Sequence, residues 1–187
     1  MPEISSLLDY AANPKVIALG ETGLDYYYQQ ESIEQQQESF VRHLQASAQS
    51  GLPVIVHTRD ARDDTIRLLR QHADTAVGGV LHCFTESWEM ARQALDLNYM
   101  ISFSGIITFR NAAELREVVR QVPIEHLLIE TDSPYLAPVP YRGKSNEPQY
   151  VVEVAQCVAD IKGLRIEEVA ERTSHNFDRM FPKAVNG

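Results

Sequence analysis

Cysteines and long hydrophobic segments are scarce in this sequence. Its two cysteines, Cys83 and Cys157, are too few for a disulfide framework and lack zinc-knuckle spacing, so we expect both to be small buried hydrophobic residues. Apolar runs such as Pro53–Val56 are far shorter than the roughly 20 residues that cross a bilayer, and Met1–Glu3 does not begin a signal peptide. These absences predict a cytoplasmic protein that does not bind membranes.

Positive charge is also in deficit. The 17 Lys and Arg residues face 26 Asp and Glu residues, which gives a formal net charge of -9. This balance argues against the large basic surface of a non-specific duplex DNA binder. It does not exclude phosphate substrates, because divalent cations held among carboxylates make a cleft locally positive.

No repeat, low-complexity tract or linker-like run divides the 187 residues, so the sequence predicts one domain spanning residues 1–187. Short aliphatic runs predict five strands, at Val16–Gly20, Pro53–His57, Gly79–Cys83, Tyr99–Phe103 and His126–Glu130. Helical periodicity marks Ser32–Ser50, Ala61–His72, Ser87–Leu97, Ala112–Val122, Tyr150–Ile161 and Ile166–Met180. Strands that are apolar on both faces and alternate with helices are typical of a parallel sheet.

The number of strands leaves two architectures open. A closed (β/α) barrel has eight βα units in roughly 250 residues, more than this sequence supplies. The chain is therefore expected to form either an open doubly wound sheet or the last part of a barrel.

Polar residues near the ends of the predicted strands favour the barrel. Four acidic or imidazole side chains occupy these positions: Glu21, His57, His82 and Asp132. Each has an ordinary structural explanation, such as a hydrogen-bonded histidine, a loop cap or a turn. In a barrel, however, the carboxyl ends of the strands converge on one mouth, where carboxylate and imidazole groups bind divalent ions. Their joint occurrence predicts a metal site.

The remaining polar and aromatic residues are less informative. We interpret the other histidines as structural or solvent-facing: His43, His72, His126 and His175. The Tyr26–Tyr28 run is either core packing, which we favour, or a nucleobase-stacking surface. Three arginines in or after loops either pair with phosphates or have solvated or structural roles: Arg59, Arg110 and Arg142.

Four ordered motifs resemble the signatures of TatD-family hydrolases, in particular the YcfH-like bacterial branch. They are Gly20–Tyr27, Pro53–Ala61, Leu81–Thr85 and Glu130–Leu136, and the Arg142–Pro148 segment fits the same pattern. The resemblance runs over nearly the whole chain. It implies a TIM-type (β/α) barrel of the metal-dependent hydrolase superfamily that cleaves phosphodiester bonds in DNA by metal-activated water.

The resemblance also assigns roles to residues. It implies that Glu21, His57, His82 and Asp132 bind the metal. Asp132 is in addition the candidate catalytic base. The implied cofactors are divalent ions, Mg²⁺, Mn²⁺ or Zn²⁺, two in a complete site, and the implied partner is DNA as substrate, with no obligate protein partner.

One family feature is missing, because the sequence contains no His-x-His pair of the kind found at the end of the family's first strand. By this resemblance Val16–Gly20 would be the fourth strand, so the chain would hold about the last five βα units of an N-terminally truncated barrel. Truncation, a gene start assigned at an internal methionine, or deliberate shortening would each produce this pattern. Two other functions stay open: hydrolysis of a small ester, amide or lactone, and an inactive truncated fragment with exposed strand edges.

Overall fold

The computed structural model describes residues 1–185, which divide into two units. The first unit contains Met1–His82, Gln93–Met100 and the residues from Asp178 onward. The second contains Cys83–Arg92 and Ile101–Phe177. The prediction of one domain is not tested by this division and stays a prediction.

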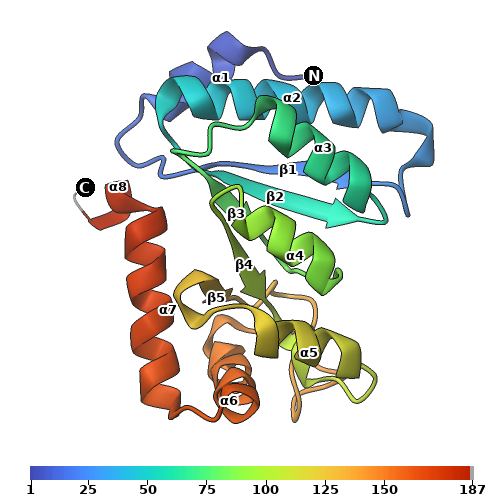
Figure 1. The fold of residues 1–187 in the computed structure, drawn as a ribbon, viewed down its shortest axis with the longest axis vertical. Helices are drawn as coiled ribbons and strands as arrows, with labels where there is room; N and C mark the ends of the chain where they lie inside the picture. The colour runs from blue at the N-terminus through green and yellow to red at the C-terminus, as the bar shows by residue number, and fades with distance from the viewer. Residues whose placement is uncertain (186–187) are drawn as a thin grey trace. The chain divides into compact units, whose positions relative to one another are not determined.

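Three parallel strands form the sheet of the first unit: β1 (Leu19–Asp25), β2 (Val54–Arg59) and β3 (Gly79–Leu81). Three helices accompany them, α1 (Ile4–Ala11), α2 (Ile33–Ser50) and α3 (Arg62–His72), and η1 (Gln30–Ser32) precedes α2. Helix α2 packs against β1 and β2, and α1 packs against α2 (Figure 1). Phe40 and Leu44 of α2 are buried with Val54 and Val56 of β2, so the apolar stripe of α2 covers the sheet. The short helix α8 (Pro182–Val185) also belongs to this unit.

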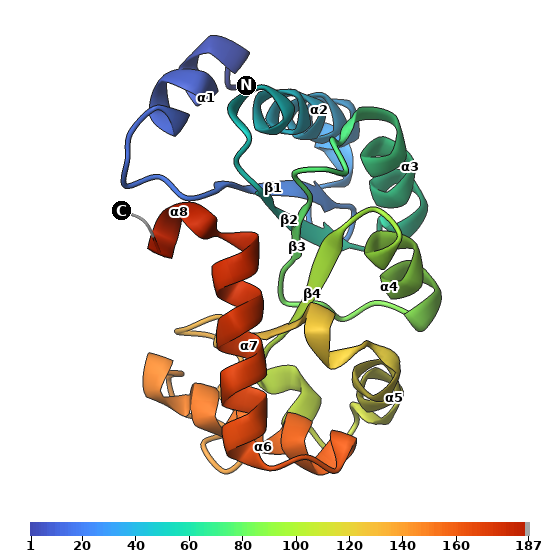
Figure 2. The ribbon, with the colours of Figure 1, turned by 60° about the vertical axis from the view of Figure 1, so that its left-hand side comes forward.

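The second unit is built around the end of β4 (Tyr99–Phe103) and β5 (Leu127–Ile129), which pair in parallel with Ile101 opposite Leu127. Its helices are α5 (Ala113–Gln121), α6 (Val151–Lys162) and most of α7 (Ile166–Met180), with 3-10 turns η2 (Gly105–Thr108), η3 (Ile124–His126) and η4 (Pro148–Tyr150). Helix α5 packs against α6, and α6 packs against β5 (Figure 1). Figure 2 shows α5, α6 and α7 from a second direction. Helix α4 (Trp88–Leu95) contributes residues to both units.

The predicted α/β class is confirmed. The five strands follow the order β1-β2-β3-β4-β5, and a helix lies between each strand and the next. The predicted strand Val16–Gly20 is wrong in its bounds, because β1 begins at Leu19 and continues to Asp25. Val16 instead packs with Ala11 and Leu52 in a small apolar cluster beside α1, a helix that the sequence analysis did not predict.

Two further expectations concern burial and membranes. Cys83 and Cys157 are free thiols, but both are only partly buried, so full burial is not confirmed. Within residues 1–185, no helix has the length and apolar character needed to cross a membrane. The cytoplasmic location stays a prediction.

Candidate metal centre

A β-bulge places the first site residue. Along β1 the register advances by three residues from Leu19 to Thr22, while β2 advances by only two. The additional residue falls in the Gly20–Glu21 pair, and bulges of this kind redirect a side chain. Gly20 has φ +146°, and a Cβ there would lie 2.7 Å from the backbone oxygen of Ile55, so the close approach of the strands requires glycine. Glu21 therefore lies inside β1, not after it as predicted.

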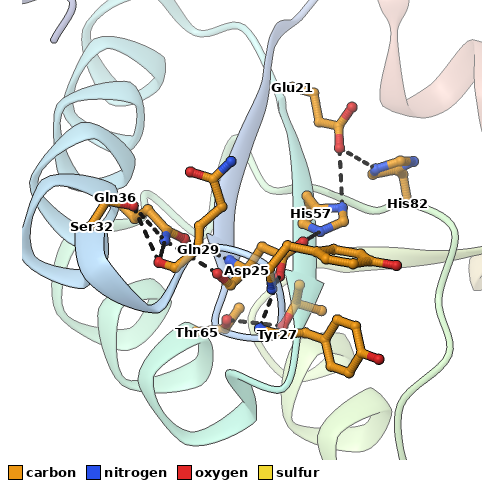
Figure 3. A network of polar contacts seen from close by, with 11 residues as sticks. Glu21, Asp25, Tyr27, Gln29, Ser32, Gln36, His57, Thr65 and His82 are labelled. Atoms are coloured by element: carbon orange, nitrogen blue, oxygen red, sulfur yellow. Dashed lines mark hydrogen bonds and ion pairs between the residues drawn. The ribbon is translucent and has the colours of Figure 1, made fainter.

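Glu21 contacts two histidines at once (Figure 3). Its Oε1 atom lies 2.8 Å from Nε2 of His82 and 3.1 Å from Nδ1 of His57. One potential ligand atom from each of the three residues lies within 4.8 Å of the other two. The two imidazole rings are 5.8 Å apart and tilted by 41°. A carboxylate and two imidazoles at this spacing form a donor set suited to a divalent transition-metal ion.

Asp25 is part of the same group, although the sequence analysis did not select it. Its Oδ2 lies 3.5 Å from Nε2 of His57, on the opposite side of the ring from the nitrogen that faces Glu21. Side chains two and four residues apart share one face of a strand, so Glu21, Gly23 and Asp25 are neighbours on β1. Gly23 pairs with His57 in the register, which places that histidine between the two carboxylates. This period-two spacing is the signal that would have identified Asp25.

Hydrogen bonds hold Asp25 in position. Its Oδ1 accepts the backbone N–H groups of Tyr27 at 3.0 Å and Tyr28 at 2.9 Å. The Gln36 side chain of α2 accepts the Asp25 N–H at 2.7 Å and donates to the Asp25 carbonyl at 3.2 Å (Figure 3). A carboxylate fixed in this way orients a ligating imidazole by accepting its remaining N–H.

A cavity of about 530 Å³ adjoins these residues, and its lining includes Glu21, His57 and His43. Nδ1 of His43 lies 2.8 Å from the Ser39 carbonyl oxygen and 3.1 Å from the Thr22 hydroxyl. These contacts agree with the structural role predicted for His43. His43 also lines the same cavity as Glu21.

The other three histidines lie outside this group. His72 ends α3, His126 ends η3 and His175 is exposed on α7. Their positions agree with the structural or solvent-facing roles predicted for them.

Asp132 belongs to the second unit, beyond the end of β5. It has φ +58°, and its carbonyl oxygen accepts the N–H of Tyr135 at 2.9 Å, which closes a turn. The buried Asn146 donates from Nδ2 to the carbonyl oxygens of Thr131 at 2.7 Å and Tyr135 at 2.6 Å. The Arg142–Pro148 segment therefore positions the Asp132 turn. Because Asp132 and the Glu21 group lie in different units, their convergence stays a prediction.

Two of the three arginines contact aromatic rings. The guanidinium of Arg59 lies 4.6 Å from the ring centres of both Tyr27 and Tyr28. Arg142 lies 3.7 Å over the Phe109 ring and donates to the Ala137 carbonyl at 3.0 Å. Arg110 is exposed after η2.

The favoured packing interpretation of the tyrosine run holds only for Tyr26, which is partly buried. Its hydroxyl donates to Asp64 at 2.8 Å. For Tyr27 and Tyr28 the packing interpretation is wrong, because these side chains are 55% and 69% exposed. Both lie beyond the end of β1, in the exposed turn that precedes η1.

The fold and this donor set are those of a metal-dependent hydrolase. Residues 2–182 match the family described as TatD related DNase, and the chain belongs to that family. It is 56% identical over 179 residues to the uncharacterized metal-dependent hydrolase YcfH of Escherichia coli, covering 96% of this chain and 68% of YcfH. The uncharacterized metal-dependent hydrolase YabD of Bacillus subtilis is 42% identical over 179 residues, with 96% and 70% covered. The predicted family is thereby confirmed.

Solved structures show the same fold. The crystal structure of the TatD homolog YJJV from Escherichia coli matches with a TM-score of 0.89 at 29% identity, over 96% of this chain and 70% of that chain. A TatD-family hydrolase from Entamoeba histolytica matches with a TM-score of 0.79 at 27% identity, over 89% of this chain and 64% of that chain. These matches support the barrel-type architecture predicted from the sequence.

Proposed function

We propose that this chain is a divalent-metal-dependent deoxyribonuclease that hydrolyses phosphodiester bonds in DNA. The metal ligands in this proposal are Glu21, His57, His82 and Asp132. The observation that carries it is the Glu21 carboxylate, which lies within 3.1 Å of two imidazole nitrogens. The name of the family, TatD related DNase, supports DNA as the substrate.

The residues present fit a divalent ion. Imidazole nitrogens suit Mn²⁺ and Zn²⁺ better than Mg²⁺, which prefers oxygen ligands and retains several waters. The Glu21, His57 and His82 set therefore favours Mn²⁺ or Zn²⁺ for the first ion. A second ion, as the family resemblance implies, would suit Mg²⁺ better if its ligands were carboxylate oxygens.

The protein groups have distinct roles in the proposed reaction. When bound, a divalent ion polarises a phosphoryl oxygen and lowers the pKa of a water by Lewis acidity. His57 would bind the ion through Nδ1, and Asp25, whose Oδ2 lies 3.5 Å from Nε2, would hold the ring in that orientation. In the proposed step, Asp132 accepts a proton from the attacking water. The water oxygen bonds to phosphorus while the bond between phosphorus and the leaving oxygen breaks.

The test begins with chelation and metal addition. After EDTA treatment and dialysis, the chain should hydrolyse DNA oligonucleotides only when Mg²⁺, Mn²⁺ or Zn²⁺ is added. Hydrolysis that persists in EDTA would contradict the mechanism. If the chain hydrolyses only lactones, carboxyl esters or amides, its substrate is a small molecule and not DNA.

Substitutions test the ligand set. Glu21→Gln and Asp132→Asn should keep the thermal unfolding midpoint close to that of the unmodified chain but lower bound metal and DNA hydrolysis by about a hundredfold or more. The matched controls Glu34→Gln and Asp9→Asn change exposed carboxylates on α2 and α1 and should alter neither quantity. Metal content measured by mass spectrometry separates ligand loss from loss of a catalytic base.

A further inference from the structure

Two exposed tyrosines and an arginine form a platform that no role in the proposed reaction uses. Tyr27 and Tyr28 meet edge to face, with ring centres 4.6 Å apart and an angle of 89° between the rings. The Arg59 guanidinium lies 4.6 Å from both ring centres. More than half of each tyrosine side chain is exposed. We call these three residues the tyrosine platform.

Large aromatic side chains at the protein surface lose the favourable burial that they have in a core. Surface positions of this kind mark binding sites when several aromatic rings are contiguous. Here the backbone that carries the rings is held in place, because Asp25 accepts the N–H groups of both tyrosines. Tyr26 adds a further fixed point, since its N–H donates to the carbonyl oxygen of Arg59 at 3.0 Å. Three hydrogen bonds therefore fix the backbone that carries the platform.

Asp25 links the platform to the candidate metal centre. One oxygen of its carboxylate holds the Tyr27 and Tyr28 backbone, and the other lies 3.5 Å from Nε2 of His57. The platform therefore begins one side chain away from a proposed metal ligand. A ligand held on the rings would have its neighbouring groups close to His57.

We propose that the tyrosine platform stacks a base of single-stranded DNA beside the phosphodiester that is cleaved. This inference rests on the proposed function and names the strand form that the site accepts. Every base has a π-face that stacks on tyrosine, and a guanidinium adds a cation–π contact and donors for a backbone phosphate. In a duplex the bases are already stacked and paired, so an exposed base is offered by a single strand. An acidic peptide would use Arg59 but not the rings.

Binding of a fluorescent thymidine hexanucleotide, measured by anisotropy in EDTA, tests the platform without hydrolysis or metal. The Tyr27→Ala/Tyr28→Ala variant should raise Kd by about fivefold or more, because stacking contributes about 1–3 kcal/mol per base. The Tyr27→Phe/Tyr28→Phe variant keeps the rings and should stay within about twofold of the unmodified chain. Tyr10→Ala removes a tyrosine that is 71% exposed on α1 and serves as the matched control.

An abasic strand of the same length identifies the contact. The unmodified chain and the double-alanine variant should bind it equally, because only the backbone is left to contact Arg59. If the double-alanine substitution weakens binding of the abasic strand as much as binding of the thymidine strand, base stacking is overturned. Equal Kd values of all variants for the thymidine strand, or no binding by the unmodified chain, would also overturn it.

The two proposals fail separately. If stacking is confirmed but the chain does not cleave DNA with added metal, the nuclease proposal fails and the platform stands. If DNA is cleaved and the alanine variant binds as tightly as the unmodified chain, the platform fails alone. Unfolding curves of each variant establish that the fold is intact before Kd values are compared.

Discussion

Gly23 of β1 lies opposite His57 of β2, and a Cβ atom at Gly23 would lie 1.9 Å from the His57 carbonyl oxygen. The glycine also has φ +141°, a conformation that L side chains rarely adopt. The two strands can therefore approach closely only because residue 23 has no side chain. This contact places His57 between Glu21 and Asp25.

Replacement of this glycine should disrupt the site and the sheet together. We expect Gly23→Ala to lower the free energy of unfolding by about 2–4 kcal/mol, since it combines backbone strain with a steric overlap. Gly51→Ala is the control, because φ is +71° but nothing lies within 4 Å of its Cβ position, so only about 1 kcal/mol should be lost. Urea unfolding measures both, and equal losses would contradict the steric argument.

Asp25 is expected to position His57 without binding the ion itself. Asp25→Asn keeps an oxygen for the Tyr27 and Tyr28 N–H groups but loses the negative charge beside His57 Nε2, so metal affinity should fall about tenfold. Titration calorimetry with Mn²⁺ or Zn²⁺ measures this change. Asp25→Ala should lower affinity further and destabilise the tyrosine loop. Unchanged affinity in Asp25→Asn would show that the 3.5 Å contact with His57 does not orient the ring.

The buried Asn146 should control the turn that carries Asp132. Asn146→Asp removes the two hydrogen bonds donated to the part-buried carbonyl oxygens of Thr131 and Tyr135 and places a carboxylate beside them, at a cost of about 1–3 kcal/mol. We expect a lower unfolding midpoint and a reduced hydrolysis rate at saturating metal. The exposed Asn111→Asp substitution is the charge-matched control and should change neither. An unchanged hydrolysis rate in Asn146→Asp would show that Asp132 does not need the hydrogen bonds of Asn146 for its role.

Acid should weaken the contact between α3 and the Tyr26 loop. Hydrogen bonds from Arg67 and from Tyr26 hold the pKa of Asp64 below its ordinary value. A carboxylate with a depressed folded-state pKa stabilises the protein above its unfolded pKa, about 4, and loses this contribution as pH falls through the folded-state value.

Asp64→Asn tests this pH dependence. It should cost about 1 kcal/mol at neutral pH, a small value because the Asp64 side chain is one third exposed, and progressively less below pH of about 4. Asp63→Asn, an exposed neighbour in the same first helical turn, is the control. Chemical unfolding at several pH values measures the difference. A constant cost across this range would contradict the predicted linkage.

Local sequence determined the secondary structure where hydrophobic periodicity was strong. Ile166–Met180 was predicted with the observed bounds of α7, and Tyr99–Phe103 with those of β4. Apolar runs and helical spacing depend on neighbours along the chain, so they can be read without a partner. The prediction of Val16–Gly20 failed for the opposite reason. The polar, glycine-containing segment Glu21–Gly23 pairs in β1 only because β2 approaches it closely.

The sequence likewise predicted that Glu21, His57 and His82 share a site, because all three are motif residues near strand ends, and the structure brings them together. Only tertiary structure decided that Asp25 contacts His57, that Asn146 holds the Asp132 turn, and that Tyr27 and Tyr28 are exposed. These contacts depend on register, on a bulge that redirects one side chain, and on hydrogen bonds between segments far apart in sequence. Such features follow from how closely two backbones approach, and hydrophobic periodicity along a single segment contains no information about that distance.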